Sequence, residues 1–156
     1  MIGTGYVGLV SGVCFSDVGN IVYCVDKDKK KINSLNKGKV PIYEPGLEEI
    51  LKRNRKAKRL FFTSDLNEAV KKSDIIFICV GTPTKKKSNS ADLKQVLTVA
   101  KQLKKSISKY KIIITKSTVP VTTGDKIEKI LSNLKKKKLI DVVSNPEFLR
   151  EGEAIR

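Results

Sequence analysis

Short runs of β-branched and aromatic residues alternate along the chain with stretches in which apolar residues recur every three or four positions. The runs predict strands at residues 21–25, 60–63, 75–80, 111–115 and 139–143. The stretches predict helices, with apolar faces in residues 7–18, 32–35, 47–51, 66–70, 93–107 and 127–134. Asp65, with Glu68 three residues later, predicts a capping-box start for the helix over residues 66–70.

Two of these strands indicate the fold class. Residues 75–80 and 112–114 are apolar without polar alternation, as expected for strands covered on both faces. Together with the alternating order of elements, they predict an α/β fold with a doubly wound parallel sheet. Ligands bind such sheets beyond the carboxyl ends of the strands. Polar, Gly and Pro residues gather at these ends, in residues 3–8, 26, 81–84, 117–120 and 145–147.

Composition narrows the class of partner. The 156 residues include 32 Lys and Arg against 16 Asp and Glu, a net charge of +16, and 40% are hydrophobic, which suits one folded domain. Lys outnumbers Arg, although Arg grips phosphate better, and residues 1–26 contain no basic residue. We interpret the charge as a lysine-rich surface, and predict no nucleic-acid partner. No apolar run approaches the ~20 residues that cross a bilayer, so we predict no membrane partner.

The cysteines are Cys14, Cys24 and Cys79, and the chain has no histidine. An odd number of cysteines without C-x-x-C spacing argues against a disulfide framework or a metal site, and favours a reducing cytoplasm. All three lie in apolar patterns, so we expect them to be inert core residues.

The segment Gly3-Thr4-Gly5-Tyr6-Val7-Gly8 fits the pattern G-x-G-x-x-G at the start of a helix. Its glycines suit a tight turn, close approach of a pyrophosphate and close packing of helix on sheet. Asp26 ends the next strand, where a carboxylate can bind a ribose hydroxyl, and no Arg follows it. The pattern therefore predicts a Rossmann-type domain that binds NAD rather than NADP.

Two further segments carry reactive groups at adjacent strand ends. Thr118 offers a hydroxyl and Glu147 a carboxylate, which together could orient a water or relay a proton. The alternative is structural: Thr118 and Asn145 would cap helices, and Glu147 would be a solvated loop acid. Spacing alone does not decide between the two interpretations.

The stretches I-G-T-G-Y-V-G-L-V-S-G, Y-E-P-G-L-E-E, V-G-T-P-T, K-S-T-V-P-V and S-N-P-E-F-L-R-E-G resemble the UDP-glucose 6-dehydrogenases of the UDP-glucose/GDP-mannose dehydrogenase family. They occur in the family's order across the chain. The resemblance implies an enzyme that uses NAD twice to oxidise UDP-glucose to UDP-glucuronate. It further implies cytoplasmic polysaccharide biosynthesis, and a homo-oligomer for the full-length enzyme. Dehydrogenases of GDP-mannose or UDP-N-acetylhexosamines are the alternatives within the family.

The resemblance also implies roles for individual residues. Thr118 and Glu147 would be catalytic. The cofactor would contact Gly3, Gly5, Val7, Gly8, Asp26, Lys31, Gly81, Thr82, Pro83, Thr84, Thr118 and Glu151. The sugar nucleotide would contact Glu147, Phe148, Leu149, Arg150 and Glu151.

Departures from the family pattern matter as well. The family's catalytic cysteine lies in a G-G-x-C-F-P-K-D-like segment that is absent from residues 1–156. We therefore interpret residues 1–156 as the NAD-binding amino-terminal domain, truncated at both ends, without the central helix and UDP-binding domain, and inactive alone. Only Met1 and Ile2 precede the glycine turn, where the central strand belongs. A stub of two residues is expected to leave both neighbouring strands unpaired. A distant alternative is a basic, non-catalytic module that binds nucleic acid.

Overall fold

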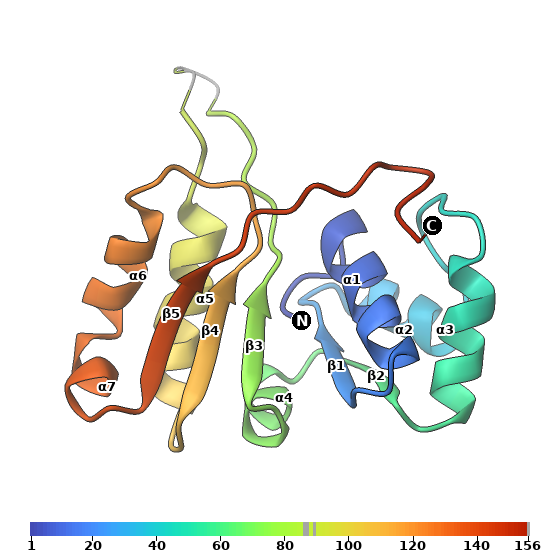
Figure 1. Cartoon of the computed structure of the whole chain (residues 1–156), viewed down its shortest axis with the longest axis horizontal. Coiled ribbons are helices and arrows are strands. Elements are labelled where there is room, and N and C mark those ends of the chain that lie inside the picture. Colours follow the sequence, from blue (N-terminus) through green and yellow to red (C-terminus); the bar gives the residue numbers. More distant parts are fainter. Residues whose placement is uncertain (86–87, 89, 156) are drawn as a thin grey trace.

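The computed structural model describes residues 1–85, 88 and 90–155. It has the predicted α/β architecture, with strands and helices alternating along the chain (Figure 1). The strands are β1 (Val22–Val25), β2 (Leu60–Thr63), β3 (Ile75–Ile78), β4 (Lys111–Thr115) and β5 (Ile140–Ser144). The helices are α1 (Tyr6–Asp17), α2 (Lys29–Asn36), α3 (Leu47–Lys56), α4 (Leu66–Lys72), α5 (Lys94–Ser106), α6 (Thr123–Ile130) and α7 (Ser132–Lys136).

All strand pairs in the sheet are parallel. β1 pairs with β2 at Val22 and Leu60, and β4 lies between β3 and β5. Ile2 forms parallel bridges to both Val25 and Ile78, which joins the two groups of strands. The spatial order is therefore β2, β1, the Met1-Ile2 segment, β3, β4 and β5, so the prediction of a doubly wound parallel sheet is confirmed.

The expectation that Met1 and Ile2 would leave their neighbours unpaired was wrong. The Ile2 N–H donates to Phe77 O, and Ile2 O accepts from the Cys79 N–H, both at 2.8 Å. On the other side, Met1 O accepts from the Val25 N–H, also at 2.8 Å. Two residues are enough because each backbone unit of a central strand bonds alternately to its two neighbours.

Helices cover both faces of the sheet. Met1 and Ile2 point in opposite directions and take part in different cores. Ile2 packs in a core built from β3, β4 and β5 with α4 to α7, whereas Met1 packs in a core with α1, α2 and α3. This arrangement places the beginning of the glycine turn, residues 3–8, at the centre of the molecule (Figure 1).

Sequence patterns misplaced some details. The Asp65 carboxylate accepts the Glu68 N–H at 3.0 Å, as predicted for a cap, but the Glu68 side chain pairs with Lys72, so only half of the capping box forms. The helix predicted around residues 127–134 is divided at Leu131 into α6 and α7. The strand at residues 75–80 was expected to be covered on both faces, but Ile75, the first residue of β3, is 50% exposed.

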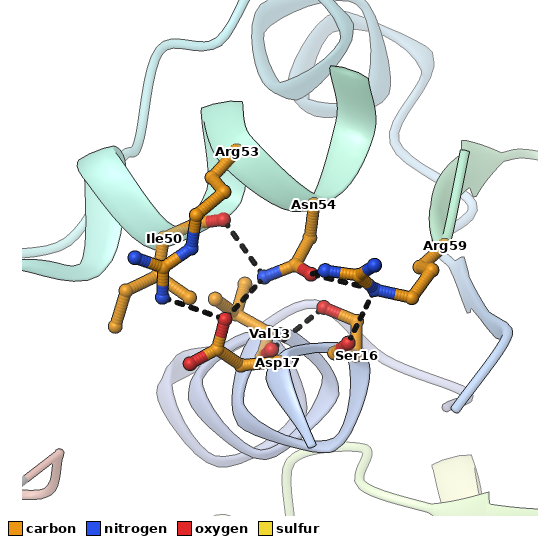
Figure 2. A network of polar contacts seen from close by, with 7 residues as sticks. All are labelled: Val13, Ser16, Asp17, Ile50, Arg53, Asn54 and Arg59. Atoms are coloured by element: carbon orange, nitrogen blue, oxygen red, sulfur yellow. Dashed lines mark hydrogen bonds and ion pairs between the residues drawn. The ribbon is translucent and has the colours of Figure 1, made fainter. Parts of the chain in front are cut away.

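A polar network connects α1 to α3 (Figure 2). The Asp17 carboxylate accepts hydrogen bonds from Arg53 at 2.7 Å and from the Asn54 amide at 2.9 Å. Arg59 donates to the Asn54 side-chain oxygen and to the Ser16 carbonyl near the end of α1. Asn54 is fully buried, so these bonds fix the helix that begins at the glycine turn against α3.

Candidate functional site

The turn after Ile2 requires glycine at two positions. Gly3 has φ = +102°, and a Cβ there would lie 2.6 Å from the Cys79 carbonyl oxygen. At Gly8 a Cβ would lie 2.0 Å from the Gly3 oxygen and 3.0 Å from the Cys79 Cβ. The first glycine permits the turn and the third permits close packing of α1 on β3, as the sequence pattern predicted.

Gly5 differs from these two glycines because it faces open space. It is exposed and precedes α1, and a Cβ built on it would have no neighbour within 4 Å. Among the described residues, no side chain caps the amino end of α1. This helix end therefore presents free N–H groups and a partial positive charge toward the space above Gly5, which suits a phosphate.

Asp26 lies beside the turn, at the end of β1. Its carboxylate accepts the Thr4 N–H at 3.0 Å, the Thr4 hydroxyl at 2.7 Å and the Asp28 N–H at 3.0 Å. Burial opposes ionisation of Asp26, but these hydrogen bonds and Lys31 outweigh it and lower its pKa from 3.8 to about 2. The carboxylate is thus charged at neutral pH. Sequence reasoning found Asp26 but not Thr4, whose hydroxyl orients it.

Lys31, predicted to contact the cofactor, lies on α2 with its ammonium 3.2 Å from the Asp26 carboxylate. Asp28 caps the same helix by accepting the N–H groups of Lys30 and Lys31. The helix start therefore brings a basic side chain close to the glycine turn, although residues 1–26 contain no basic residue. The side chains of Asp26 and Lys31 are 12% and 31% exposed, so Lys31 retains access to solvent.

The segments after β3 and β4 meet above the sheet. The Thr82 hydroxyl donates to the Thr118 carbonyl at 2.8 Å, and the buried Ser117 hydroxyl donates to the Val80 carbonyl at 2.7 Å. Gly81, Pro83 and Thr84 are exposed beside them, as is Thr118. Thr118 does not cap a helix, because α6 begins at Thr123. The structural interpretation of Thr118 was therefore wrong.

The chain after β5 crosses the carboxyl ends of the strands as an extended segment (red in Figure 1). Glu147 is partly buried, and its carboxylate accepts the Leu149 N–H at 2.9 Å. Leu149 packs on the core beside α1, while Phe148 is 93% exposed. Arg150 pairs with Glu153, and Glu151 is exposed.

The two predicted catalytic residues are not joined directly. Of the hydrogen bonds among the described residues, none connects Thr118 to Glu147. Asn145 instead links the two segments, because its side-chain oxygen accepts from Lys116 at 3.5 Å and its N–H donates to the Thr115 carbonyl at 3.0 Å. Asn145 therefore does not cap a helix.

Glu44 is a site residue to which sequence reasoning gave no role. This buried carboxylate accepts the Tyr6 hydroxyl and the N–H groups of Gly152, Ala154 and Ile155, with the Gly152 bond at 2.9 Å. It thereby ties the end of the chain to the first residue of α1. Glu44 stands in the Y-E-P-G turn, which the sequence shows. Its partner Gly152 lies 108 residues away, so no local sequence pattern reveals the hydrogen bond between them.

Cys24 and Cys79 are buried where α1 packs on the sheet, and Cys14, on α1, is partly buried. Burial raises the pKa of Cys24 to about 11 and that of Cys79 to about 12, and also raises the pKa of the partly buried Cys14. All three are therefore protonated at neutral pH and unsuited to act as nucleophiles. Within the described part of the chain, His, Cys, Asp and Glu nowhere form a metal-binding group, and no helix has the length and apolar character to cross a membrane.

A match to a protein-family model identifies the family of this chain. The NAD binding domain of the UDP-glucose/GDP-mannose dehydrogenase family matches residues 1–156. The chain belongs to this family. The glycine turn, the open end of α1 and the Asp26 carboxylate are accordingly parts of an NAD-binding domain, and the resemblance seen in the sequence motifs is confirmed.

Individual relatives agree with the family assignment. The chain is 52% identical to the UDP-glucose 6-dehydrogenase of Rhizobium meliloti over 155 residues, which are 99% of this chain and 36% of the relative. It is also 52% identical to the UDP-glucose 6-dehydrogenase TuaD of Bacillus subtilis, covering 99% of this chain and 34% of that one. The chain therefore spans about a third of the length of these curated relatives.

Solved structures show the same fold. A GDP-mannose dehydrogenase from Pseudomonas aeruginosa, solved as a ternary complex, superimposes with a TM-score of 0.92 at 41% identity, over 99% of this chain and 37% of that one. A UDP-glucose dehydrogenase from Pyrobaculum islandicum has the same TM-score at 38% identity, over 99% and 36% of the two chains.

Proposed function

We propose that this chain binds NAD through the Gly3 to Gly8 turn, as the cofactor-binding part of a UDP-glucose 6-dehydrogenase. The observation that carries the proposal is the open space at Gly5, bounded by the uncapped end of α1 and by the Asp26 carboxylate. Backbone N–H groups at the helix end would hold the pyrophosphate, and Asp26 would accept a ribose hydroxyl. Val7, Lys31, the 81–84 segment, Thr118 and Glu151 would line the rest of the cofactor site.

Asp26 also supports NAD over NADP. Its low pKa keeps a negative charge where NADP would bring a second one on its 2′-phosphate. Lys31 already pairs with Asp26, and no Arg follows Asp26 in the sequence. The expected preference is therefore for the cofactor without the phosphate.

The proposed reaction is the oxidation of UDP-glucose to UDP-glucuronate in two NAD-dependent steps. The identity to the two UDP-glucose 6-dehydrogenases favours this substrate over GDP-mannose or UDP-N-acetylhexosamines. Thr118 and Glu147 would serve the proton and hydrolysis steps. The exposed segment 147–151 would contact the sugar nucleotide. The enzyme would be a cytoplasmic homo-oligomer of polysaccharide biosynthesis.

We further propose that residues 1–156 alone do not oxidise UDP-glucose. The reaction proposed for the family needs a cysteine nucleophile, and the thiols of this chain are buried or partly buried, with raised pKa values. The nucleophile and the UDP-binding domain would belong to a further part of the enzyme. Formation of NADH from UDP-glucose and NAD by the purified chain would contradict this proposal.

Titration calorimetry with NAD tests the binding site. Gly5→Val should weaken NAD binding at least tenfold, because the side chain would enter the open space without touching the fold. Gly124→Ala is a matched control, since a Cβ there also meets nothing within 4 Å, on a distant helix. Equal affinity of Gly5→Val and the unaltered chain, or tighter binding of NADP than of NAD, would refute the assignment.

A further inference from the structure

Thr4 is the second residue of the glycine turn, and it is buried, with an exposed fraction of 1%. The positive φ of Gly3 and the hydrogen bond from the Gly3 N–H to the Val25 carbonyl at 2.8 Å hold the turn beside the end of β1. From this position Thr4 donates to Asp26 twice, through its N–H at 3.0 Å and its hydroxyl at 2.7 Å. A hydroxyl has one proton to donate, and here the proton goes to the carboxylate that is proposed to bind the cofactor.

The two carboxylate oxygens of Asp26 have different numbers of donors. Oδ2 accepts the Thr4 N–H, the Thr4 hydroxyl and the Lys31 ammonium, the last at 3.2 Å. The described residues give Oδ1 one donor, the Asp28 N–H at 3.0 Å. A carboxylate oxygen has about two lone-pair sites, so Oδ2 is saturated, whereas Oδ1 retains room for about one further donor. Oδ1 is therefore the oxygen that can receive a ribose hydroxyl, while Oδ2 fixes the carboxylate in place.

We propose that Thr4 is a positioning residue that sets the preference of this site for NAD over NADP. This role rests on the proposed binding of NAD at the glycine turn. Thr4 acts through Asp26, because its two donors occupy Oδ2, stop the carboxylate from turning and leave Oδ1 as the acceptor for a ligand. The fixed carboxylate can then accept a hydroxyl donor but not a second anion.

Two effects of the Thr4 hydroxyl act in the same direction. Its hydrogen bond favours the ionised form of Asp26, which accepts a ribose hydroxyl and repels the 2′-phosphate of NADP. Without this bond, the carboxylate could turn and release the Lys31 ammonium, which would then pair with that phosphate. Removal of the hydroxyl should therefore weaken the binding of NAD and favour the binding of NADP.

The hydroxyl, rather than the backbone, is the specific feature of this position. Any residue except proline would offer an N–H to Asp26 here. Serine keeps the hydroxyl that threonine has, whereas valine has nearly the same shape without it. A comparison of Thr4→Ser with Thr4→Val therefore separates the hydrogen bond from the shape of the side chain.

Titration calorimetry of the chain with NAD and with NADP measures the preference as a ratio of two dissociation constants. Thr4→Val should weaken NAD binding about tenfold without weakening NADP binding, so the preference for NAD should fall by about tenfold or more. Thr4→Ser should keep the preference within about twofold of the unaltered chain, because its hydroxyl can still donate to Asp26. Thr98→Val is the matched control, since it removes an exposed hydroxyl that donates to the Lys94 carbonyl at 2.7 Å on α5, and it should leave the preference unchanged.

A form of NAD without the 2′-hydroxyl on its adenosine ribose separates a role in recognition from a role in stability. It should bind the unaltered chain about tenfold more weakly than NAD does. For Thr4→Val the difference should shrink to about twofold, because the hydroxyl would then meet a carboxylate that is no longer held in place. Thr4→Ala provides the same comparison if urea unfolding shows that the valine variant does not fold.

The outcomes distinguish this role from the proposed function. If the unaltered chain binds NAD, and Thr4→Val keeps its preference or Thr4→Ser loses it, the proposed role of Thr4 is overturned while the NAD site stands. If the unaltered chain binds neither NAD nor NADP, the proposed function fails, and the role of Thr4 fails with it.

Discussion

Asp26 and Glu44 are carboxylates surrounded by donors that belong to distant parts of the chain. Asp26 accepts from Thr4 across the dinucleotide turn, and Glu44 accepts from Tyr6 and from the N–H groups of the last segment. Buried carboxylates with this many donors remain charged, because hydrogen bonds to the charged form outweigh the cost of desolvation. Asp26 thereby holds the glycine turn to the end of β1, and Glu44 holds residues 152–155 to the first residue of α1.

Replacing Asp26 by Asn should reduce stability at neutral pH by about 1–2 kcal/mol, allowing for solvent screening. The pKa of Asp26 is lower in the folded chain than its ordinary 3.8, so its contribution is complete above pH about 4 and is lost as pH falls toward about 2. Urea unfolding between pH 2 and pH 7 measures the effect. The gap between the unaltered chain and Asp26→Asn should close at the acid end, whereas the exposed control Asp125→Asn should show no such gap.

Glu44→Gln should release the last segment from α1. A glutamine side chain has one oxygen acceptor where the carboxylate has two. Its NH2 group would face the backbone N–H groups of Ala154 and Ile155 and could not accept hydrogen bonds from them. Hydrogen exchange at Gly152 and Ala154 should accelerate about tenfold, the equivalent of about 1.4 kcal/mol. Glu48→Gln, which removes only a surface pair with Lys52, is the matched control and should leave both amides unchanged. Unchanged exchange in Glu44→Gln would show that the segment is held by other contacts.

At the scale of elements, α1 is fixed at both ends. Its amino end begins at the glycine turn, and its carboxyl end is held to α3 by the network of Asp17, Asn54 and Arg59 (Figure 2). Gly12 adds a close approach in the middle, since a Cβ there would lie 2.6 Å from the Cys24 sulfur. The orientation of the helix end proposed to bind phosphate thus depends on contacts far from the ligand.

Asn54→Ala should lower the free energy of unfolding by about 1–3 kcal/mol, because Asp17 and Arg59 would each lose a buried partner. Urea denaturation gives the loss directly. Asn133→Ala, an exposed position on α7, is the control and should change stability by less than about 0.5 kcal/mol. A loss in Asn54→Ala no greater than in the control would mean that water replaces the network without cost.

Most elements could be predicted because their apolar periodicity and their end signals agree. β2 begins at Leu60 and ends at Thr63 as predicted, and Asp65 caps α4. The break at Leu131 had no signal, since its helical apolar spacing continues through Leu134. The bridge at Ile2 was missed because a two-residue strand has no periodicity to detect. Its pairing depends on β1 and β3, which are far away in sequence.

The site was predictable to the extent that its chemistry is local. The glycine turn and Asp26 follow a fixed spacing, so the sequence alone located them. Thr4 and Glu44 depend on side chains brought together by the fold, and the pattern gave no indication of them. Whether Thr118 and Glu147 are catalytic stays a prediction.

For the whole molecule, charge opposes folding. With a net charge of +16, the lysines on the outer helix faces repel one another over the ~30 Å Debye length of a dilute buffer. Surface ion pairs such as Lys72 with Glu68 stabilise the folded chain by only about 0.3–0.5 kcal/mol each. Salt therefore screens more repulsion than attraction in this chain.

Raising NaCl from about 10 mM to about 500 mM should accordingly raise the melting midpoint by about 2–4 °C, or about 1 kcal/mol. Calorimetry at several salt concentrations measures the slope. The double variant Lys101→Glu and Lys104→Glu, at exposed positions on α5, lowers the net charge to 16 − 4 = 12 and should reduce the slope. A melting midpoint that falls with added NaCl would show instead that the surface ion pairs outweigh the repulsion between lysines. In that case the double variant would be less stable than the unaltered chain at low salt.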